Sequence, residues 1–568
     1  MSDLPEHRGD HVTALPQISD SSAGSAQRTV RRLVVYILLF ALVVTAAIGV
    51  SGLLERLLGS TEVIVGGGSS QLARSFAFTL IAGPLAAILW WFVWKRLDDR
   101  AERSSLAWGL YLAGMYTVSL ITFTTALLAT VASLIEGDWR PGDLATGLVW
   151  AAVWAWHRWM LRHPGKAPTR LSSVPDVVGF TFGLAVGVGG AITALSSLLD
   201  EAILGSAGAG AVGDPWWQPV LQSLVWAVGG AIVWWWHWVR SGARRLRTVL
   251  SDVAVIGFGV LIPSILTLGG IGVVLWVLLR LGFDRSEPNR VLLEPLAPAI
   301  AAALVGALVW FYHRAVLPER SDAARQAARL ITSGVALVFA ASGVGVIVNA
   351  TLGAVTPTLA GTDTRTLLLG GISSLIVGAP VWWLFWRGTD TLSPARRVYL
   401  IVVFGLSAVV ALIALLVIGF RIFEFLFDVD QAGSLLDRVR APFGLLVATA
   451  LVSGYHFSIW RRDRAAIAAA TPVRPRTIGH VTLVTAGDSE AAVRLIRDAT
   501  GAAVTVWRRT DVAASVGAGA GAGPGAEAGA GAGADAAQLV RALDGVTGDE
   551  VFVLVGPGTR IEVVPAAR

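Results

Sequence analysis

The stretch Val233-Trp234-Trp235-Trp236-His237-Trp238-Val239-Arg240 decides the architecture of this chain. It ends an apolar segment and leads directly into a basic cluster, so that tryptophan, histidine and arginine follow one another at the expected end of a helix. Related stretches recur along the chain, at 90–96, 154–158, 310–314, 382–387 and 453–462. Recurrence of one pattern at a regular spacing is typical of repeated structural units.

The composition is that of a polytopic membrane protein. Of 568 residues, 54% are hydrophobic and 15% are charged, and the mean hydropathy is +0.66. A soluble globular protein has about 25% charged residues, and many apolar runs here approach the ~20 residues that a transmembrane helix requires. Cysteine is absent, which excludes disulfides, thiolate nucleophiles and cysteine-ligated metals.

The apolar runs predict an all-α polytopic membrane protein of about twelve transmembrane helices. The odd spans are long and contain glycine, the even spans end with the tryptophan stretch, and each odd–even pair is expected to form a helical hairpin. The spans run roughly 33–54, 76–94, 106–134, 144–161, 177–199, 219–239, 249–281, 296–316, 328–352, 366–386, 398–427 and 442–460. The membrane domain, 28–465, therefore contains six two-helix repeats, at about 28–98, 99–165, 166–243, 244–320, 321–390 and 391–465.

The loop charges predict the orientation of the spans. Loops after even spans are rich in arginine, whereas loops after odd spans carry acids such as Glu136, Asp138 and Asp143. The positive-inside rule then places both termini in the cytoplasm. Because this rule accounts for the arginines, we expect the lipid bilayer as a partner and no nucleic acid. The arginine-rich, lysine-poor composition is typical of a high-GC bacterium, so the predicted location is the bacterial plasma (inner) membrane.

The segments outside the membrane domain differ in character. Residues 1–27 are polar and without periodicity, which indicates a disordered cytosolic tail. Residues 466–476 read as a linker, and 477–568 alternate strand-like and helix-like segments, which predicts a small C-terminal cytosolic α/β appendage. Within it, 515–534 is a Gly/Ala run expected to be disordered. This appendage is the expected contact for a cytosolic protein partner.

Tryptophan is the first candidate for a functional role, with 23 residues gathered mostly at the ends of even spans. Indole has an apolar body and one N–H donor, so it favours the boundary between lipid and water. The alternative is an aromatic box that binds an organic cation, although no acidic residue recurs beside the stretch.

Histidine is the second candidate. His157, His237, His313 and His456 occupy one position of the repeat, where the first and fifth copies have Val93 and Phe385. We expect the four imidazoles to be polar anchors at the helix ends, with partly wet rings. Convergence of the hairpins would instead allow them to bind a metal or haem.

Four further features have simple structural interpretations. Gly179, Gly183 and Gly187 predict close helix packing, and prolines 84, 263 and 380 predict kinks or helix starts. Arg421 and Glu424 are expected to pair on one helix face. The third span carries several hydroxyls, which either bond back to helix carbonyls or form a polar lane. The hydroxyls are Thr117, Ser119, Thr122, Thr124, Thr125 and Thr130.

The repeat itself resembles the bacterial, chiefly actinobacterial, family called domain of unknown function 5671, which occurs in tandem copies. The resemblance rests on 31–36, with its arginine-rich start, on the acidic turn of 133–136 and on the Trp-His-Arg end at 154–158. It extends over about 28–465 and is weakest in the fifth and sixth copies. It implies an integral membrane protein and assigns no activity, so it supplies no site residues.

These observations leave three functions open. The first is a non-enzymatic membrane protein with a role in assembly or regulation, and the second is a transporter or channel for a small solute. A membrane-embedded enzyme is third, because no nucleophile–base pair or metal set is apparent. We assign no catalytic, cofactor-binding or metal-binding residues and expect no cofactor.

Overall fold

The computed structural model describes residues 20–59, 68–205, 215–284, 286–355, 364–387, 389–391, 393–427, 434–470, 478–485, 489–508, 538–539, 541–546, 548–555 and 561–566. The chain divides into two compact units, 1–460 and 461–568. Expectations for most of the tail, for 471–476 of the predicted linker and for the run at 515–534 lie outside the described residues. The first part of the linker predicted at 466–476 is helical, because α16 continues to Ala470. Helix α1 begins at Asp20, inside the expected tail.

The first unit is helical. Its longer helices are α1 (Asp20–Leu58), α3 (Gly83–Arg96), α5 (Leu106–Glu136), α6 (Pro141–Arg162), α7 (Val174–Leu204), α8 (Trp217–Trp235), α10 (Ile262–Phe283), α12 (Leu296–Val316), α13 (Asp322–Val355), α14 (Thr364–Trp386), α15 (Pro394–Phe427) and α16 (Leu435–Ala470). The short helices are α2 (Gly68–Ala77), η1 (Phe78–Ala82), α4 (Arg100–Arg103), η2 (Trp236–Arg240), η3 (Ala243–Arg245), α9 (Val249–Ile256), η4 (Gly257–Leu261), α11 (Asn289–Leu293) and η5 (Leu317–Glu319).

Eleven segments of the described chain are long and apolar enough to cross a membrane. Eleven of the twelve predicted spans coincide with these segments. The exception is the span predicted at 144–161, which is present as helix α6 but is not among the eleven. This helix ends in tryptophan, histidine and arginine, so its composition is less apolar than that of its neighbours.

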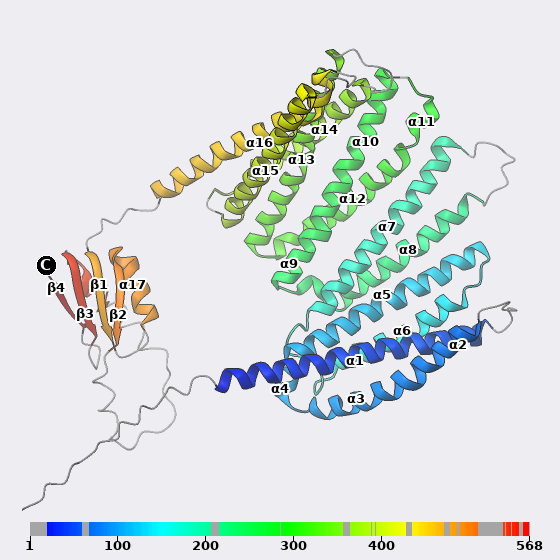
Figure 1. Cartoon of the computed structure of the whole chain (residues 1–568), viewed down its shortest axis with the longest axis horizontal. Helices are drawn as coiled ribbons and strands as arrows, with labels where there is room; N and C mark the ends of the chain where they lie inside the picture. Colours follow the sequence, from blue (N-terminus) through cyan, green and yellow to red (C-terminus); the bar gives the residue numbers. More distant parts are fainter. Residues whose placement is uncertain are drawn as a thin grey trace, which may run out of the picture. The chain divides into compact units, whose positions relative to one another are not determined.

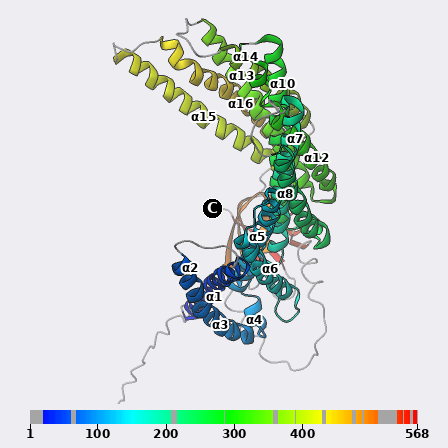
Figure 2. The same cartoon turned by 90° about the vertical axis from the view of Figure 1, so that its right-hand side faces the viewer.

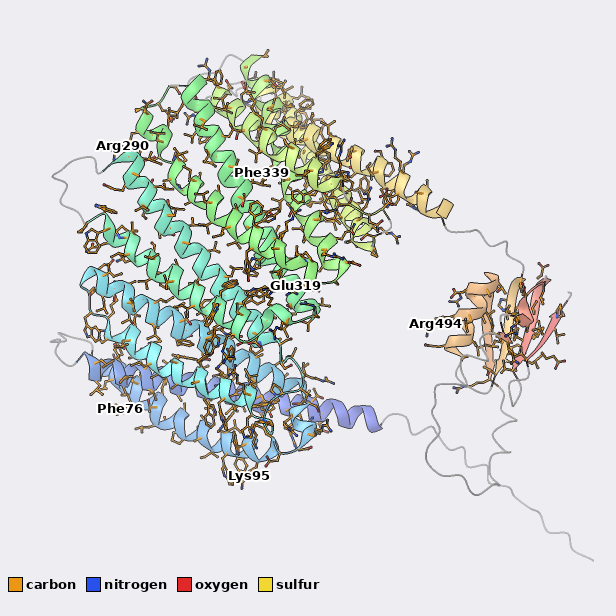
Figure 3. All side chains as sticks on the ribbon, turned by 180° about the vertical axis from the view of Figure 1, so that it is seen from behind. Phe76, Lys95, Arg290, Glu319, Phe339 and Arg494 are labelled. Carbon is orange, nitrogen blue, oxygen red and sulfur yellow. The ribbon has the colours of Figure 1, made fainter. Side chains whose placement is uncertain are left out.

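Several of the expected helix pairs pack closely along the chain. The closest pairs are α5 with α6, α7 with α8, α10 with α12, and α13 with α14. Figure 1 shows the helices running between two ends of the unit, with α4 and α9 near one end and α2 and α11 near the other. Lys95 and Glu319 lie toward the first end and Phe76 and Arg290 toward the second (Figure 3). We call the first end the basic end, because it carries the arginine-rich loops.

The helix pairs stand in a curved row. Figure 2 shows this row from α1 at one extreme to α16 at the other, with α15 leaning away from its neighbours. Many large apolar side chains on the row are exposed, and α15 alone presents Leu406, Leu416 and Phe420 at 62–65% exposure. Exposure of this kind is what a helix facing lipid tails requires.

Local sequence signals set the helix ends, as α5 and α6 illustrate. The side chain of Ser105 accepts a hydrogen bond from the backbone N–H of Trp108 and so caps α5. The same helix ends at Gly137, whose φ of 79° is left-handed. Pro141 then opens α6, where its missing N–H is not needed. The turn between the paired helices is therefore specified locally.

The glycine ladder of α7 forms the predicted close contact. A Cβ atom added to Gly183 would lie 2.3 Å from the backbone nitrogen of Trp234, and one added to Gly187 would lie 3.1 Å from that of Ala231. The same contact is seen from the other helix, since a Cβ added to Gly230 of α8 would lie 2.1 Å from the backbone nitrogen of Gly187. The two helix backbones therefore touch directly, which requires the absence of side chains at these positions.

Two of the three prolines start helices, as predicted. Pro84 and Pro263 stand in the first turns of α3 and α10, each directly after a π-helical turn, η1 or η4. Proline lacks the N–H that a continuous α-helix would use, so the backbone hydrogen-bond pattern widens to a π-helical turn before it. Pro380 lies inside α14. The predicted pair on α15 also forms, because Arg421 and Glu424 are joined by an ion pair of 2.8 Å.

The second unit contains the small α/β fold expected for the appendage. Strands β1 (Ile478–Thr485), β2 (Ala503–Arg508), β3 (Gly548–Val555) and β4 (Ile561–Ala566) form one sheet in the order β2-β1-β3-β4. β1 pairs in parallel with β2 and β3, whereas β3 and β4 are antiparallel. Helix α17 (Glu490–Thr500) links β1 to β2, and its Ile496 packs in a core with Val481 and Val551.

We predict that Gly230→Ala lowers the stability of the membrane unit by about 1–3 kcal/mol, because the new methyl group would force the α7 and α8 backbones apart. The control is Gly189→Ala, where an added Cβ meets nothing within 4 Å. Unfolding of both variants in mixed detergent micelles, followed by circular dichroism, measures the difference. Equal stability of the two variants would contradict the close packing.

Candidate functional site: aromatic joints at the basic end

At the basic end, three clusters join consecutive hairpins, and each cluster consists of aromatic rings and one histidine. In each, two tryptophans one helical turn apart on one hairpin pack on an aromatic–histidine pair of the next. We call these clusters the aromatic joints. They consist of Trp90 and Trp94 with Trp156 and His157, of Trp234 and Trp238 with Tyr312 and His313, and of Trp382 and Trp386 with Tyr455 and His456.

The second and third aromatic joints have nearly the same geometry. The centroids of Trp234 and Trp382 each lie 6.4 Å from the histidine of their joint, and those of Trp238 and Trp386 lie 5.6 Å from it. In both, the second tryptophan donates its indole N–H to the tyrosine hydroxyl, at 2.9 Å and 3.1 Å. The first joint has Trp156 in place of the tyrosine and packs by ring contact, with Trp90 6.2 Å from His157.

The tryptophans divide into two sets with different environments. The last tryptophan of the motif faces inward, as the burial of Trp238 and Trp386 shows. The tryptophan that directly follows the first tryptophan of each joint faces outward. These residues, Trp91, Trp235 and Trp383, are 53%, 49% and 48% exposed. The outward set has the half-exposed position that suits a boundary anchor, whereas the inward set holds the hairpins together.

All four repeated histidines are buried, so the expectation of partly wet rings is wrong. His157, His237, His313 and His456 are between 0% and 2% exposed. In each, Nδ1 lies 2.7–2.8 Å from the carbonyl oxygen four residues earlier in the same helix. A carbonyl only accepts, so Nδ1 carries the proton and Nε2 holds a free electron pair. The sequence could not show this burial, because the covering rings belong to the neighbouring hairpin.

The free electron pair of Nε2 meets different partners. The Tyr111 hydroxyl donates to His157 Nε2 at 3.2 Å, and the Tyr116 hydroxyl donates to His237 Nε2 at 2.8 Å. Nε2 of His313 and Nε2 of His456 are buried without a hydrogen-bond partner among the described residues. The histidines thus serve mainly as flat, polarisable rings within the aromatic joints.

His237 does not belong to an aromatic joint of the same kind. It packs against Gly179, where an added Cβ would lie 2.2 Å from its ring, and it bonds to Tyr116 of the preceding hairpin pair. In the fifth copy, Phe385 occupies the same repeat position and contacts Trp310 at 5.8 Å. The single repeat position therefore contains two structural roles that alternate from copy to copy.

A buried cation of the chain itself covers the inward tryptophan of each aromatic joint. Lys166 lies 4.5 Å from the Trp94 ring, Arg320 lies 5.9 Å from Trp238, and Arg396 lies 4.7 Å from Trp386. These cations are at most 9% exposed. Their favourable position over the indole faces fills the place that an organic cation would take, so the geometry does not support the aromatic-box alternative.

The first of these cations has a carboxylate partner in the adjoining loop. Lys166 Nζ donates to Asp98 at 2.7 Å, and this hydrogen bond and charge lower the pKa of the Asp98 carboxyl. The lowered pKa means that the pair is intact at neutral pH and is lost only as the pH falls through the folded-state pKa of Asp98. Because the Asp98 side chain is 77% exposed, water screens the pair and its contribution is small.

The described residues contain no group of three or more His, Asp or Glu side chains placed to hold a metal ion. The histidines lie in separate ring clusters rather than around one shared pocket. Three of the six hydroxyls of the third span bond to their own helix, since Ser119, Thr125 and Thr130 donate to the carbonyls of Met115, Ile121 and Ala126. For these three residues the interpretation as back-bonding is confirmed. The Thr124 hydroxyl is buried and has no partner among the described residues.

A cavity of about 490 Å³ lies between α13, α15 and α16. Most of its lining is apolar, and its polar members are Ser342, Asn349, Ser407 and Thr449. The hydroxyls of Ser407 and Thr449 already donate to carbonyls of their own helices. The amide oxygen of Asn349 is buried and has no partner within the described chain. One unused polar atom on an apolar wall does not form the convergent polar set of a solute site.

The sequence alone did not identify the tyrosines and buried cations of the aromatic joints. A usable signal is present, because tryptophan stands three residues before and one residue after the repeat position in the first, third and fifth copies. The second, fourth and sixth copies lack the later tryptophan and have an aromatic residue directly before the histidine, a feature that the third copy shares in Trp236. This alternation indicates that the structural unit is a pair of hairpins. The prediction of six two-helix repeats treated all six copies as equivalent and did not use this difference.

The comparisons with known proteins agree with a unit of two hairpins. The family model described as Domain of unknown function (DUF5671) matches residues 32–156 and residues 326–451. Each match extends over two consecutive hairpins, α1 to α6 in the first and α13 to α16 in the second. No curated protein and no solved structure matches the chain.

We predict that His157→Phe destabilises the protein more than His456→Phe does. The first change leaves the buried Tyr111 hydroxyl without an acceptor, which costs about 1–3 kcal/mol. The second change removes His456 Nε2, which has no partner, and the bond from Nδ1 to the Val452 carbonyl. Its cost should therefore be close to that of one average membrane hydrogen bond, ~0.6 kcal/mol. Unfolding in mixed micelles measures both. The double change His157→Phe with Tyr111→Phe should recover part of the loss, and a recovery of zero would contradict the assigned contact.

Proposed function

We propose, for a chain that carries two copies of the DUF5671 domain, that it is a non-enzymatic membrane scaffold made of three four-helix units in a row. In this proposal the first and third units are the two matched segments. The middle unit, about 174–316, is a diverged third copy. The observation that carries the proposal is the aromatic joint, which recurs in the middle segment with the same rings and nearly the same distances as in the third.

The chemistry of the joints supports a scaffold over an enzyme. Their histidines and the inward rings of Trp238 and Trp386 are buried, and their cations are supplied by the chain itself. The indole N–H groups of Trp238 and Trp386 are donated to tyrosine hydroxyls. Such a cluster holds two hairpins together, although the first joint also lines a cavity of about 400 Å³ with Trp90, Trp156 and His157. The α/β appendage then supplies a surface for a cytosolic protein partner, and the assembly role follows from joining that partner to the membrane array.

The proposed setting is the bacterial plasma membrane, with twelve spans and both termini in the cytoplasm. The basic end would face the cytoplasm, as the positive-inside rule requires. Helix α6 would be the least apolar of the twelve spans, held in place by α1 and α5, against which it packs.

A transporter or channel for a small solute is the alternative. The cavity between α13, α15 and α16 favours it, since solute sites lie between membrane helices. Its apolar lining and the open, curved row of helices favour the scaffold (Figure 2). The two proposals differ in whether solutes cross the bilayer through the protein.

Reconstitution into sealed liposomes tests this choice. The scaffold predicts that vesicles with the full chain have the same ion conductance and the same osmotic swelling in sugars, amino acids and polyols as empty vesicles. A protein-dependent flux of any of these solutes, lost on Asn349→Leu, would favour the transporter.

Extraction of the chain with its surrounding lipid should also retain a stoichiometric protein partner that is lost when residues 477–568 are removed. Absence of such a partner would contradict the assembly role.

The absence of cysteine allows the topology to be tested with single cysteines against no background. Arg100→Cys and Arg247→Cys should react with a membrane-impermeant maleimide only after the cells are opened, because both positions lie at the basic end. Asp138→Cys and Glu287→Cys, at the opposite end, should react in intact cells. Two or more of the four positions with the reverse behaviour would overturn the proposed orientation.

A further inference from the structure

The four-helix units of the row contact one another through the same helices each time. The third helix of one unit packs on the second helix of the following unit, α5 on α8 and α10 on α14. A Cβ added to Gly229 of α8 would lie 2.2 Å from Cδ2 of Leu128 on α5, and the Tyr116 hydroxyl of α5 donates to His237 at 2.8 Å. We call this packing the unit contact.

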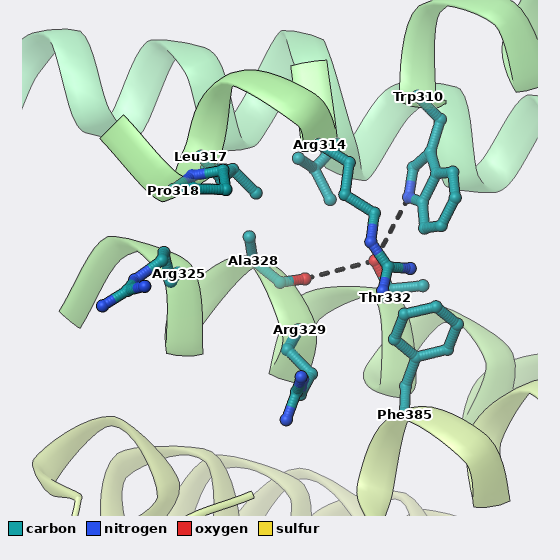
Figure 4. A pocket seen from close by; sticks show the side chains of 10 residues that line it. Trp310, Arg314, Leu317, Pro318, Arg325, Ala328, Arg329, Thr332 and Phe385 are labelled. Atoms are coloured by element: carbon teal, nitrogen blue, oxygen red, sulfur yellow. Dashed lines mark hydrogen bonds between the residues drawn. The ribbon is translucent and has the colours of Figure 1, made fainter. Parts of the chain in front are cut away.

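At the basic end, the unit contact includes an arginine of the fourth helix. The guanidinium of Arg158 on α6 lies 4.7 Å from the Trp236 ring of the following unit. That of Arg314 on α12 lies 4.9 Å from the Phe385 ring of the third unit (Figure 4). Each arginine directly follows the repeated histidine of its helix, so one position of the repeat makes the contact in both places.

Helix α15 has the place of α5 in the third unit. Tyr111 of α5 and Tyr399 of α15 each pack on the joint histidine of their own unit, with ring centroids 5.8 Å and 6.0 Å apart. Eight residues later in each helix, Ser119 and Ser407 donate to two carbonyls of their own helix. The two helices therefore align without a gap over this stretch.

The residues of the third unit at the positions of Tyr116, Leu128 and the two arginines are apolar and exposed. They are Phe404 at 38%, Leu416 at 65% and Phe457 at 39% exposure. Phe404 and Phe457 stack on each other at 5.4 Å. We call these three residues the outward face of the third unit. An exposed apolar face is ordinary in a bilayer, but this one stands where both other units make the unit contact.

The first unit exposes the other half of the unit contact. Its second helix ends in α3, and the tryptophan pairs of the first two aromatic joints align α3 with α8. Leu85 then stands at the position of Gly229, and Phe92 at that of Trp236. Leu85, Ile88 and Phe92 are 49%, 55% and 50% exposed, and their spacing of three and four residues places them on one side of the helix. We call these three residues the outward face of the first unit.

We propose that chains associate head to tail in the membrane, with the outward face of the third unit of one copy on the outward face of the first unit of the next. This inference rests on the proposed scaffold, because it continues the row of units beyond one chain. Arg396 near the start of α15 and Trp94 near the end of α3 both belong to aromatic joints at the basic end. The two helices therefore run in opposite directions when both copies have the same orientation in the bilayer, as α5 and α8 do within one chain.

The contact between copies is expected to be weaker than the unit contact within a chain. Leu85 fills the space that Gly229 leaves for a neighbouring side chain, so the two backbones cannot approach as closely. The rings of Phe404 and Phe457 can pack on Phe92 instead, in place of an arginine on an aromatic ring. Because the two faces differ, each added copy leaves one free face of each kind, and the association does not close at a dimer.

Because the chain has no cysteine, single-cysteine chains test this contact in native membranes. One full chain carries Leu416→Cys and a second, with a different tag, carries Leu85→Cys, and copper phenanthroline oxidises cysteines that lie close together. We expect a disulfide-linked dimer that holds both tags, and another for Phe457→Cys with Phe92→Cys. The exchanged pair, Leu416→Cys with Phe92→Cys, should give no such dimer, because these positions lie at different depths.

The matched control replaces Leu416→Cys by Leu304→Cys. Leu304 of α12 is 58% exposed and lies at a similar depth to Leu85, but it belongs to neither outward face. Equal yields of dimer from Leu304→Cys and Leu416→Cys with the same Leu85→Cys partner would indicate random collision and overturn the proposal. So would the absence of the mixed dimer, or a dimer of Leu416→Cys with itself in place of the mixed one, which would indicate a symmetric pair.

A measurement on the unaltered chain keeps the test valid if a variant fails to fold. Mass photometry of the full chain, extracted together with its surrounding lipid, should show a series of monomer, dimer and trimer, as a contact that does not close requires. Monomers alone, or dimers with nothing larger, would contradict the head-to-tail contact.

A disulfide within one chain separates this inference from the proposed function. Leu128→Cys with Gly229→Cys should form an internal disulfide, because these positions touch in the unit contact. An internal disulfide without any dimer between chains would reject the head-to-tail contact and leave the scaffold in place. Loss of the internal disulfide would reject the row of units on which both proposals rest, and solute flux in the liposome test would reject the scaffold.

Discussion

The contact on which the rest of the structure depends is the packing of two inward indoles on the histidine of the next hairpin. Lipid tails are as apolar as a leucine side chain, so helices in a bilayer are not driven together by apolar burial. They associate where shapes fit or where polar groups find partners. The aromatic joints supply both, through flat rings 5.6–6.4 Å apart and indole N–H groups that reach tyrosine hydroxyls. The cation above each joint, such as Arg320, is held there by the ring face and by its own carboxylate, Asp252.

The joints at the basic end act together with close backbone contacts along the helices. Within a hairpin, glycines such as Gly183 and Gly230 let two helices touch along their length. Between hairpins, the rings fix the relative angle at the basic end. Hairpins also meet at the opposite end, where the Trp276 indole donates to the Thr366 carbonyl and the Thr366 hydroxyl donates to Asp284. The row of helix pairs is curved, as Figure 2 shows. Backbone contacts within hairpins and ring contacts between hairpins suit a scaffold, because each unit is rigid while the row remains open at both extremes.

Much of this architecture could be predicted from the sequence, and the reasons are local. Apolar run length identified the long helices, proline marked the starts of α3 and α10, and the four-residue glycine spacing predicted a close helix contact on α7. Two features could not be obtained in this way. The burial of His157 and His456 depends on rings from a neighbouring hairpin, and no local pattern encodes that contact. The expected equivalence of six copies also concealed the alternation between joint histidines and His237, because similar tryptophan-rich ends serve two different contacts.

The central claim is that three four-helix units, each closed by an aromatic joint, form an open row. A cryo-EM map of the full chain in lipid nanodiscs tests this claim most directly. The account predicts that the middle unit, about 174–316, superposes on the units that contain 32–156 and 326–451, with His157, His313 and His456 each enclosed by its own rings. A map in which the helices close into a ring around a water-filled path, with those histidines facing that path, would contradict it.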